Sequence, residues 1–127
     1  MLQYLYMHKL LVVDDDEYIR DLYEEILKDA KFDVDTAIDG KDGYDKIVAG
    51  SYDLILLDIM MPKMDGVEVL RELSEKSKEN ASKVILLTNL AHDPVMKEAL
   101  DLGAKAYLIK ADMTPDQLVE KIQDYLK

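Results

Sequence analysis

The stretch Leu54-Ile55-Leu56-Leu57-Asp58-Ile59-Met60-Met61-Pro62-Lys63-Met64-Asp65-Gly66 decides the fold. Its first four residues are apolar without a break, which is typical of a strand buried on both faces of a parallel sheet. The run ends at the carboxylate of Asp58, and Pro62 and Asp65-Gly66 then predict a loop and a turn. A single acid thus stands where a central strand leaves the core, at the edge where open α/β sheets bind ligands. Taken alone, Asp58 is equally well explained as a loop or cap residue, so its role depends on the rest of the chain.

Strands and helices alternate along the whole chain, which predicts an α/β fold with a parallel sheet. The second strand alternates apolar and polar residues and is expected at an edge. Right-handed crossovers then favour a doubly wound five-stranded sheet of order 2-1-3-4-5, covered by five helices. The other strands are expected at Lys9–Val13, Asp33–Ile38, Lys83–Leu87 and Ala106–Ile109.

Several helix ends carry clear signals. Asp16 is expected to cap the first helix, and Gly50 to end the second. Thr114-Pro115-Asp116-Gln117 is a capping box that opens the last helix. The polar run Ser74–Ser82 is expected to form a solvated helix end and a loop. The buried stripe of the first helix consists of Ile19, Leu22, Tyr23, Ile26 and Leu27.

Length and composition predict a single domain over residues 1–127, with Met1–Tyr6 as a frayed extension or an added sheet edge. The chain is 49% apolar and 34% charged, so it can bury a core. Its 27 acids outnumber its 16 bases, and the net charge of −11 disfavours direct binding to nucleic acid. No Cys is present, and no apolar stretch approaches the roughly 20 residues of a membrane span. A cytoplasmic protein without membrane contact is therefore expected.

Polar groups collect at the carboxyl ends of the predicted strands. Asp14 and Asp15 follow the first strand, Asp58 the third, Thr88 the fourth and Lys110 the fifth. In the order 2-1-3-4-5 these four strands are neighbours, so the groups are expected to converge on one edge. Each residue alone could be a cap or a solvated side chain, but their convergence favours a functional site.

The chemistry of this edge follows from its charges. Three carboxylates held a few ångströms apart repel one another, and they require a cation unless they share protons. Oxygen ligands suit a hard ion such as Mg²⁺, whereas the absence of Cys disfavours zinc. A carboxylate beside such a metal can act as a nucleophile toward a phosphoryl group. A Lys ammonium and a Thr hydroxyl would then stabilise the phosphoryl oxygens.

These segments together resemble the receiver domain of two-component response regulators. The matches come in the family's order and spacing and cover nearly the whole chain. They are Leu11-Val12-Val13-Asp14-Asp15, Leu57–Gly66, Leu86-Leu87-Thr88 and Gly103–Lys110. The resemblance implies a flavodoxin-like fold and a stand-alone, chemotaxis-type switch controlled by phosphorylation.

The resemblance also implies the phosphoacceptor and the metal ligands. Asp58 would accept the phosphoryl group. Asp15 would bind Mg²⁺ or Mn²⁺ directly, Asp14 mainly through water, and Met60 through its backbone carbonyl. The only chemistry implied is self-catalysed aspartyl phosphorylation and dephosphorylation, so no separate enzyme activity is expected.

Three further roles and two departures come with the family. Thr88 would be the switch hydroxyl, Tyr107 the switch aromatic, and Lys110 the cation that pairs with the phosphoryl group. Asn89 stands where the family usually has a small residue, and it would crowd access to the acceptor. Ala111 stands where the family usually has Pro, which would loosen the following loop.

The implied partners are a sensor histidine kinase or histidine phosphotransfer domain, and a separate effector or a second copy of the chain. The effector is expected to be separate because no output domain follows Lys127. Its docking face would comprise the helix that opens at Asp93-Pro94, the strand Ala106–Ile109 and the last helix.

Two other functions compete with this one. An aspartyl phosphatase usually carries its nucleophile after the first strand and has a cap, whereas Asp58 follows the third. A degenerate receiver would serve only as a binding module, without metal affinity. For the switch itself, Met60 and Leu90 are apolar and cannot orient an attacking water, so slow self-dephosphorylation is expected.

Overall fold

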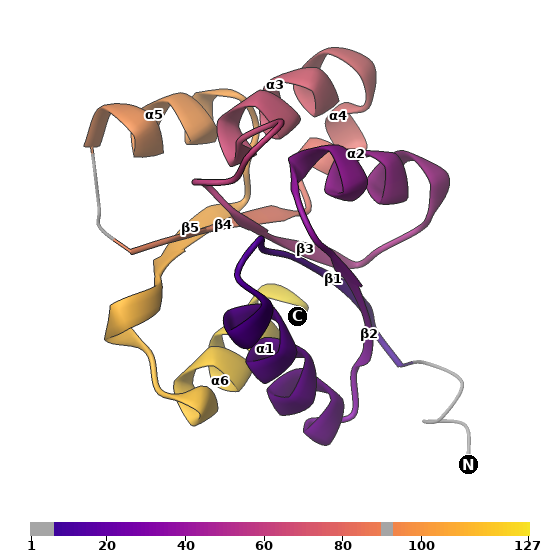
Figure 1. The fold of residues 1–127 in the computed structure, drawn as a ribbon, viewed down its shortest axis with the longest axis vertical. Coiled ribbons are helices and arrows are strands. Elements are labelled where there is room, and N and C mark those ends of the chain that lie inside the picture. Colours follow the sequence, from indigo (N-terminus) through magenta and orange to yellow (C-terminus); the bar gives the residue numbers. More distant parts are fainter. Residues whose placement is uncertain (1–6, 90–92) are drawn as a thin grey trace.

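The computed structural model describes residues 7–89 and 93–127, with the backbone alone at residues 93 and 111. Five parallel strands form one sheet in the order β2-β1-β3-β4-β5, which confirms the predicted topology (Figure 1). The strands are β1 Lys9–Val13, β2 Asp33–Ala37, β3 Leu54–Asp58, β4 Val84–Thr88 and β5 Ala106–Ile109.

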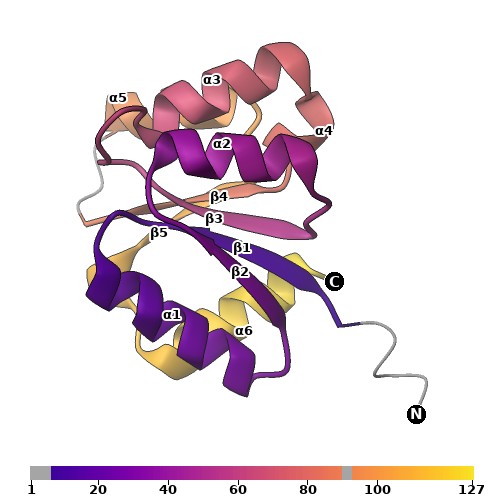
Figure 2. The same cartoon turned by 45° about the vertical axis from the view of Figure 1, so that its right-hand side comes forward.

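Helices cover both faces of the sheet. Figure 2 shows α1 (Glu17–Asp29) and α6 (Pro115–Tyr125) together on one face. The other face carries α2 (Gly40–Ala49), α3 (Gly66–Lys76) and α5 (Asp93–Asp101). Within the described residues no helix is long and apolar enough to cross a bilayer.

The sheet separates two apolar cores because successive side chains of a strand point to opposite faces. Leu10 and Val12 of β1 belong to the core beneath α1 and α6, whereas Leu11 and Val13 belong to the core beneath α2 and α3. All four are completely buried. Burying a large apolar side chain contributes about 1.5–3 kcal/mol, so the uninterrupted apolar strands stabilise both layers at once.

The predicted caps are present. The Asp16 carboxylate accepts the backbone N–H of Ile19 at 3.2 Å, and the N–H of Gly50 donates to the end of α2. Thr114 and Gln117 form the reciprocal capping box of α6. These caps fix where α1 and α6 begin, and both starts lie beside the carboxyl edge of the sheet.

The structure differs from the sequence prediction in three local respects: the number of helices and, by one residue each, the bounds of β2 and of β4, which spans Val84–Thr88 rather than Lys83–Leu87. The described residues form six α-helices rather than five, because α4 (Lys78–Ala81) occupies the run expected to be a loop. Its polar sequence lacks an apolar stripe, but Ala81 is buried and anchors the turn. In addition, β2 ends at Ala37, because the N–H of Ile38 turns to the Asp42 carboxylate in α2 at 3.0 Å.

Candidate functional site

The register of the central strands brings two of the predicted acids together. Val13 of β1 pairs with Leu57 of β3, so the residues that follow them, Asp14 and Asp58, stand side by side. The N–H of Asp14 also donates to the carbonyl of Ala37 at 3.2 Å, which holds this end of β1 against β2.

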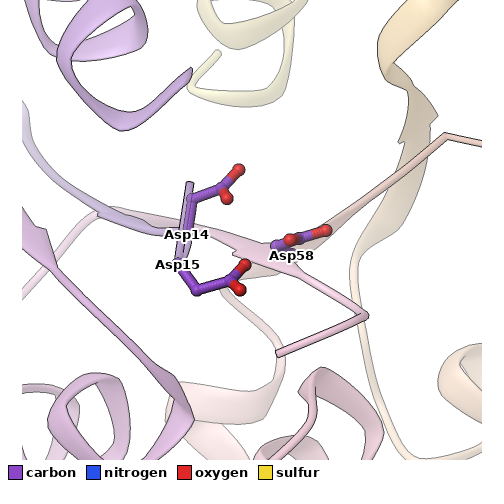
Figure 3. Close-up of side chains that lie close together, drawn as sticks. All are labelled: Asp14, Asp15 and Asp58. Atoms are coloured by element: carbon purple, nitrogen blue, oxygen red, sulfur yellow. The ribbon is translucent and has the colours of Figure 1, made fainter. Parts of the chain in front are cut away.

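Three carboxylates form a cluster at this edge (Figure 3). Oxygen atoms of Asp14, Asp15 and Asp58 all lie within 4.8 Å of one another. Asp14 and Asp58 are buried, whereas Asp15 is exposed. Three oxygen donors at this spacing, one of them open to solvent, fit a hard divalent cation such as Mg²⁺ or Mn²⁺.

Lys110 reaches the cluster from the end of the edge strand β5. It directly follows β5 and is the first residue of the 3-10 turn η2 (Lys110–Asp112). Its Nζ lies 2.9 Å from Asp14 Oδ2 and 3.3 Å from Asp58 Oδ1, and its side chain is only 11% exposed. One buried ammonium therefore bridges two buried carboxylates.

Burial and charge act against each other on these groups. The pKa of Asp58 is raised to about 6, because burial raises it most, the Lys110 ammonium lowers it in part, and the negative Asp14 raises it again. For Lys110, burial disfavours the charge, but the hydrogen bond to Asp14 and the attraction of Asp58 outweigh it and raise its pKa. Lys110 is therefore charged at neutral pH. Asp58 is ionised as well, although its burial makes the ionised form energetically unfavourable.

Asp14 is already engaged by protein groups. One oxygen accepts the N–H of Asp16 at 2.9 Å and the other accepts Lys110. Arg20 also donates from Nη1 to the Asp14 backbone carbonyl at 2.9 Å. By contrast, the Asp15 carboxylate makes no hydrogen bond to any other described residue, so it is the freer of the two acids to bind an ion.

Arg20 is a residue that the sequence analysis missed. A basic residue one turn into α1, six positions after Asp14, is the signal that could have found it, because that turn lies over the carboxyl end of β1. Its guanidinium fixes the backbone from which both acids project.

The predicted switch residues lie at different distances from the cluster. Thr88 ends β4, is 9% exposed, and lines a cavity of about 360 Å³ together with Asp58 and Met96. Tyr107 lies on β5, is 38% exposed, and lines neither this cavity nor the larger one on the other side of Asp58. The structure thus brings Thr88 to the site and leaves Tyr107 at the surface.

Met60 and Asn89 border both cavities beside Asp58. The Met60 side chain is 79% exposed, and Asn89 is exposed as well. Leu90, which the sequence analysis paired with Met60, lies outside the described residues. All peptide bonds of the described residues are trans, including the bond between Lys110 and Ala111.

Comparison with protein families decides what kind of domain carries this site. Residues 10–123 match the model of the response regulator receiver domain. The chain belongs to the response regulator receiver domain family. This membership supports a role in phosphorylation-controlled signalling.

Curated relatives agree with this assignment. The chemotaxis protein CheY of Treponema pallidum is 38% identical over 123 residues, which cover 94% of this chain and 83% of that protein. The transcriptional regulatory protein DltR of Streptococcus agalactiae is 39% identical over 115 residues, covering 91% of this chain and 50% of DltR. The chain thus spans about half the length of DltR.

Solved structures resemble the whole receiver domain. The Vibrio cholerae chemotaxis protein CheY4 superposes with a TM-score of 0.86 at 30% identity, covering 95% of this chain and all of CheY4. The Thermotoga maritima response regulator TrrA, in complex with Mg²⁺-BeF, gives a TM-score of 0.82 at 38% identity, covering 94% of this chain and all of TrrA.

Proposed function

We propose that this receiver domain accepts a phosphoryl group on Asp58 from a phosphohistidine of a sensor kinase or phosphotransfer domain. The observation that carries the proposal is the buried Lys110 ammonium, which touches both Asp14 and Asp58 beside the exposed carboxylate of Asp15. This arrangement combines a nucleophile, a fixed cation and a place for a metal ion within one small edge.

In the proposed step an oxygen of Asp58 attacks the phosphorus. The P–N bond to the imidazole breaks, its electron pair stays on nitrogen, and that nitrogen takes a proton. Lys110 then turns from Asp14 toward the phosphoryl oxygens, whose negative charge it balances. Thr88, at the edge of the same site, donates its hydroxyl to another phosphoryl oxygen.

Asp14, Asp15, Asp58 and the backbone carbonyl of Met60 would hold Mg²⁺ or Mn²⁺. When bound, this ion would neutralise the carboxylates and the phosphoryl charge. Asp15 would bind directly, because its carboxylate is exposed and makes no hydrogen bond within the described chain. Asp14 would act mainly through water, because both its oxygens already accept hydrogen bonds. The Mg²⁺-BeF complex of TrrA supports this choice of ion.

Phosphorylation would be read at the surface of α5, β5 and α6. Tyr107, which is exposed on β5, would turn inward as Thr88 moves toward the phosphoryl group. A separate effector, or a second copy of the chain, would bind the changed face. A coupling of about 1–3 kcal/mol is typical for such a switch and shifts the population without making it complete.

Phosphoramidate, a small donor with a P–N bond, tests the proposal without a cognate kinase. We expect intact-protein mass spectrometry to detect one phosphoryl group in the presence of Mg²⁺, and none with EDTA or in the Asp58→Asn variant. Asp45→Asn, an exposed acid in α2, is the matched control and should be labelled like the wild type. Full labelling of Asp58→Asn, or none of the wild type, would contradict the proposal.

A further inference from the structure

Tyr23 is a polar residue at the site that the proposed function does not use. It was predicted as part of the buried stripe of α1, and it is 8% exposed. Its side chain lines a cavity of about 540 Å³ whose walls also include Asp14, Asp58 and Lys110. Ile19, Leu22, Met113 and Leu118 are among the apolar residues of this wall.

The Tyr23 hydroxyl makes no hydrogen bond to any other residue that the structure describes. No buried side-chain polar atom of the described residues lacks a hydrogen-bond partner, so this hydroxyl is not enclosed but opens into the cavity. The other deeply buried tyrosine of the described residues instead satisfies its hydroxyl within the protein. Tyr52, at 5% exposure, donates to Asp35 at 2.9 Å. The Tyr23 hydroxyl therefore keeps both a donor and an acceptor function for a group that enters the cavity.

The charged groups of the site affect the pKa of this hydroxyl. Burial raises the pKa of Tyr23, the Lys110 ammonium lowers it in part, and Asp14 and Asp58 raise it further. Lys110 is thus the leading charge felt by the phenol. An ammonium has three N–H donors, and the two carboxylates, Asp14 and Asp58, engage at most two of them, so one donor remains for another acceptor.

We propose that Tyr23 is a positioning residue whose hydroxyl accepts a hydrogen bond from Lys110 when Lys110 leaves Asp14 for the phosphoryl group. This inference rests on the proposed function. In the unphosphorylated chain Asp14 holds the ammonium at 2.9 Å. Once Lys110 turns to the phosphoryl oxygens, that bond lengthens, and Tyr23 compensates for its loss from inside the same cavity. The hydroxyl thereby stabilises the phosphorylated arrangement over the resting one.

Beryllium fluoride at saturating Mg²⁺ is the probe, and calorimetry measures its binding. Tyr23→Phe removes only the hydroxyl, and we expect it to weaken beryllofluoride binding roughly tenfold, the loss of one hydrogen bond to a charged group. The affinity for Mg²⁺ alone and the melting temperature in EDTA should stay at their wild-type values. Tyr125→Phe, on α6 beneath the same face of the sheet, is the matched control and should change nothing.

A double-mutant cycle separates this role from general packing. In a Lys110→Met background, which keeps the stem but not the ammonium, Tyr23→Phe should have no further effect. An unchanged beryllofluoride affinity in Tyr23→Phe, or an equal loss in the Lys110→Met background, would overturn the inference alone. Failure of the wild type to bind beryllofluoride would overturn the proposed function and this inference with it.

Discussion

At the scale of single residues, the fold buries the Asp58 carboxylate, which water would solvate in the unfolded chain. The native chain binds a proton at Asp58 more tightly than the unfolded chain does, because burial raises its pKa from 3.8 to about 6. A raised carboxyl pKa contributes stability below the unfolded value and loses that contribution as the pH rises through about 6. At neutral pH the ionised Asp58 therefore destabilises the metal-free fold, and the proposed cation or phosphoryl group would relieve this cost.

The first consequence is that Asp58→Asn stabilises the metal-free protein. At pH 7.5 in EDTA we expect a gain of about 1–3 kcal/mol in the free energy of unfolding, because the pKa of Asp58 is raised to about 6 in the folded chain. At pH 4.5 the gain should fall to less than half, because native Asp58 is then protonated. Urea unfolding at both pH values measures this, with Asp45→Asn as an exposed control. A variant less stable than wild type at pH 7.5 contradicts the argument.

A second residue-scale prediction concerns the lifetime of the phosphoryl group. The exposed Met60 side chain borders both cavities beside Asp58 and has no group that orients water. Met60→Asn supplies such a group, and we expect self-dephosphorylation to accelerate roughly tenfold, the worth of one hydrogen bond in the transition state. Release of inorganic phosphate from labelled protein is the measurement. Met60→Leu, which remains apolar, should hydrolyse at the wild-type rate; equal rates for both variants would refute the prediction.

At the scale of elements, the start of α2 holds the loop between β3 and α3. A Cβ on Gly40 would lie 1.6 Å from the carbonyl oxygen of Met64, so the two backbones touch. Asp39, which caps α2, also pairs with Lys63 of this loop at 3.5 Å. The same loop carries Met60, so its fixed path positions the carbonyl proposed as a metal ligand.

Replacing Gly40 tests this contact between elements. Alanine in a helix is ordinarily more stable than glycine by roughly 0.5–1 kcal/mol. Here we expect Gly40→Ala to destabilise the chain by about 1–3 kcal/mol through overpacking, and to weaken Mg²⁺ binding because the loop must shift. Thermal unfolding and Mg²⁺ titration measure the two effects. Lys41→Ala, the neighbouring exposed position, is the control; if Gly40→Ala is as stable as that variant, the contact is unimportant.

The elements show what a sequence can and cannot predict. β3 and its neighbours could be predicted from apolar runs that end at a polar residue, because a strand buried on both faces has an unbroken apolar sequence. The short helix α4 was missed because it depends on the burial of Ala81 rather than on a periodic stripe. Tyr23 was predicted only as a core residue, since helical spacing identifies the buried face but not the cavity that a hydroxyl enters. Likewise, the hydrogen bond of Arg20 depends on where α1 begins over β1.

At the scale of the whole molecule, the net charge of −11 and the carboxylate cluster both attract cations. An acidic surface raises the local concentration of cations and repels polyanions. Long-range attraction of this kind is screened by salt, with a Debye length of about 8 Å at physiological ionic strength. A bound ion at the cluster differs from this diffuse effect, because it depends on particular carboxylates and persists in salt.

The stability of the chain in Mg²⁺ distinguishes a bound ion from diffuse screening, and it also tests which of the three consecutive acids, Asp14, Asp15 and Asp16, bind the ion. A ligand that binds only the native state adds about 2.7 kcal/mol at a concentration one hundred times its Kd. We expect this gain in the wild type at constant ionic strength, and its loss in Asp15→Asn, whose exposed carboxylate is the proposed direct ligand. Asp16→Asn should retain the gain, because Asp16 caps α1 and asparagine caps equally well. If Asp16→Asn loses the added stability in Mg²⁺ while Asp15→Asn keeps it, the metal site uses a different pair of acids. If both variants keep the added stability, charge screening alone explains it.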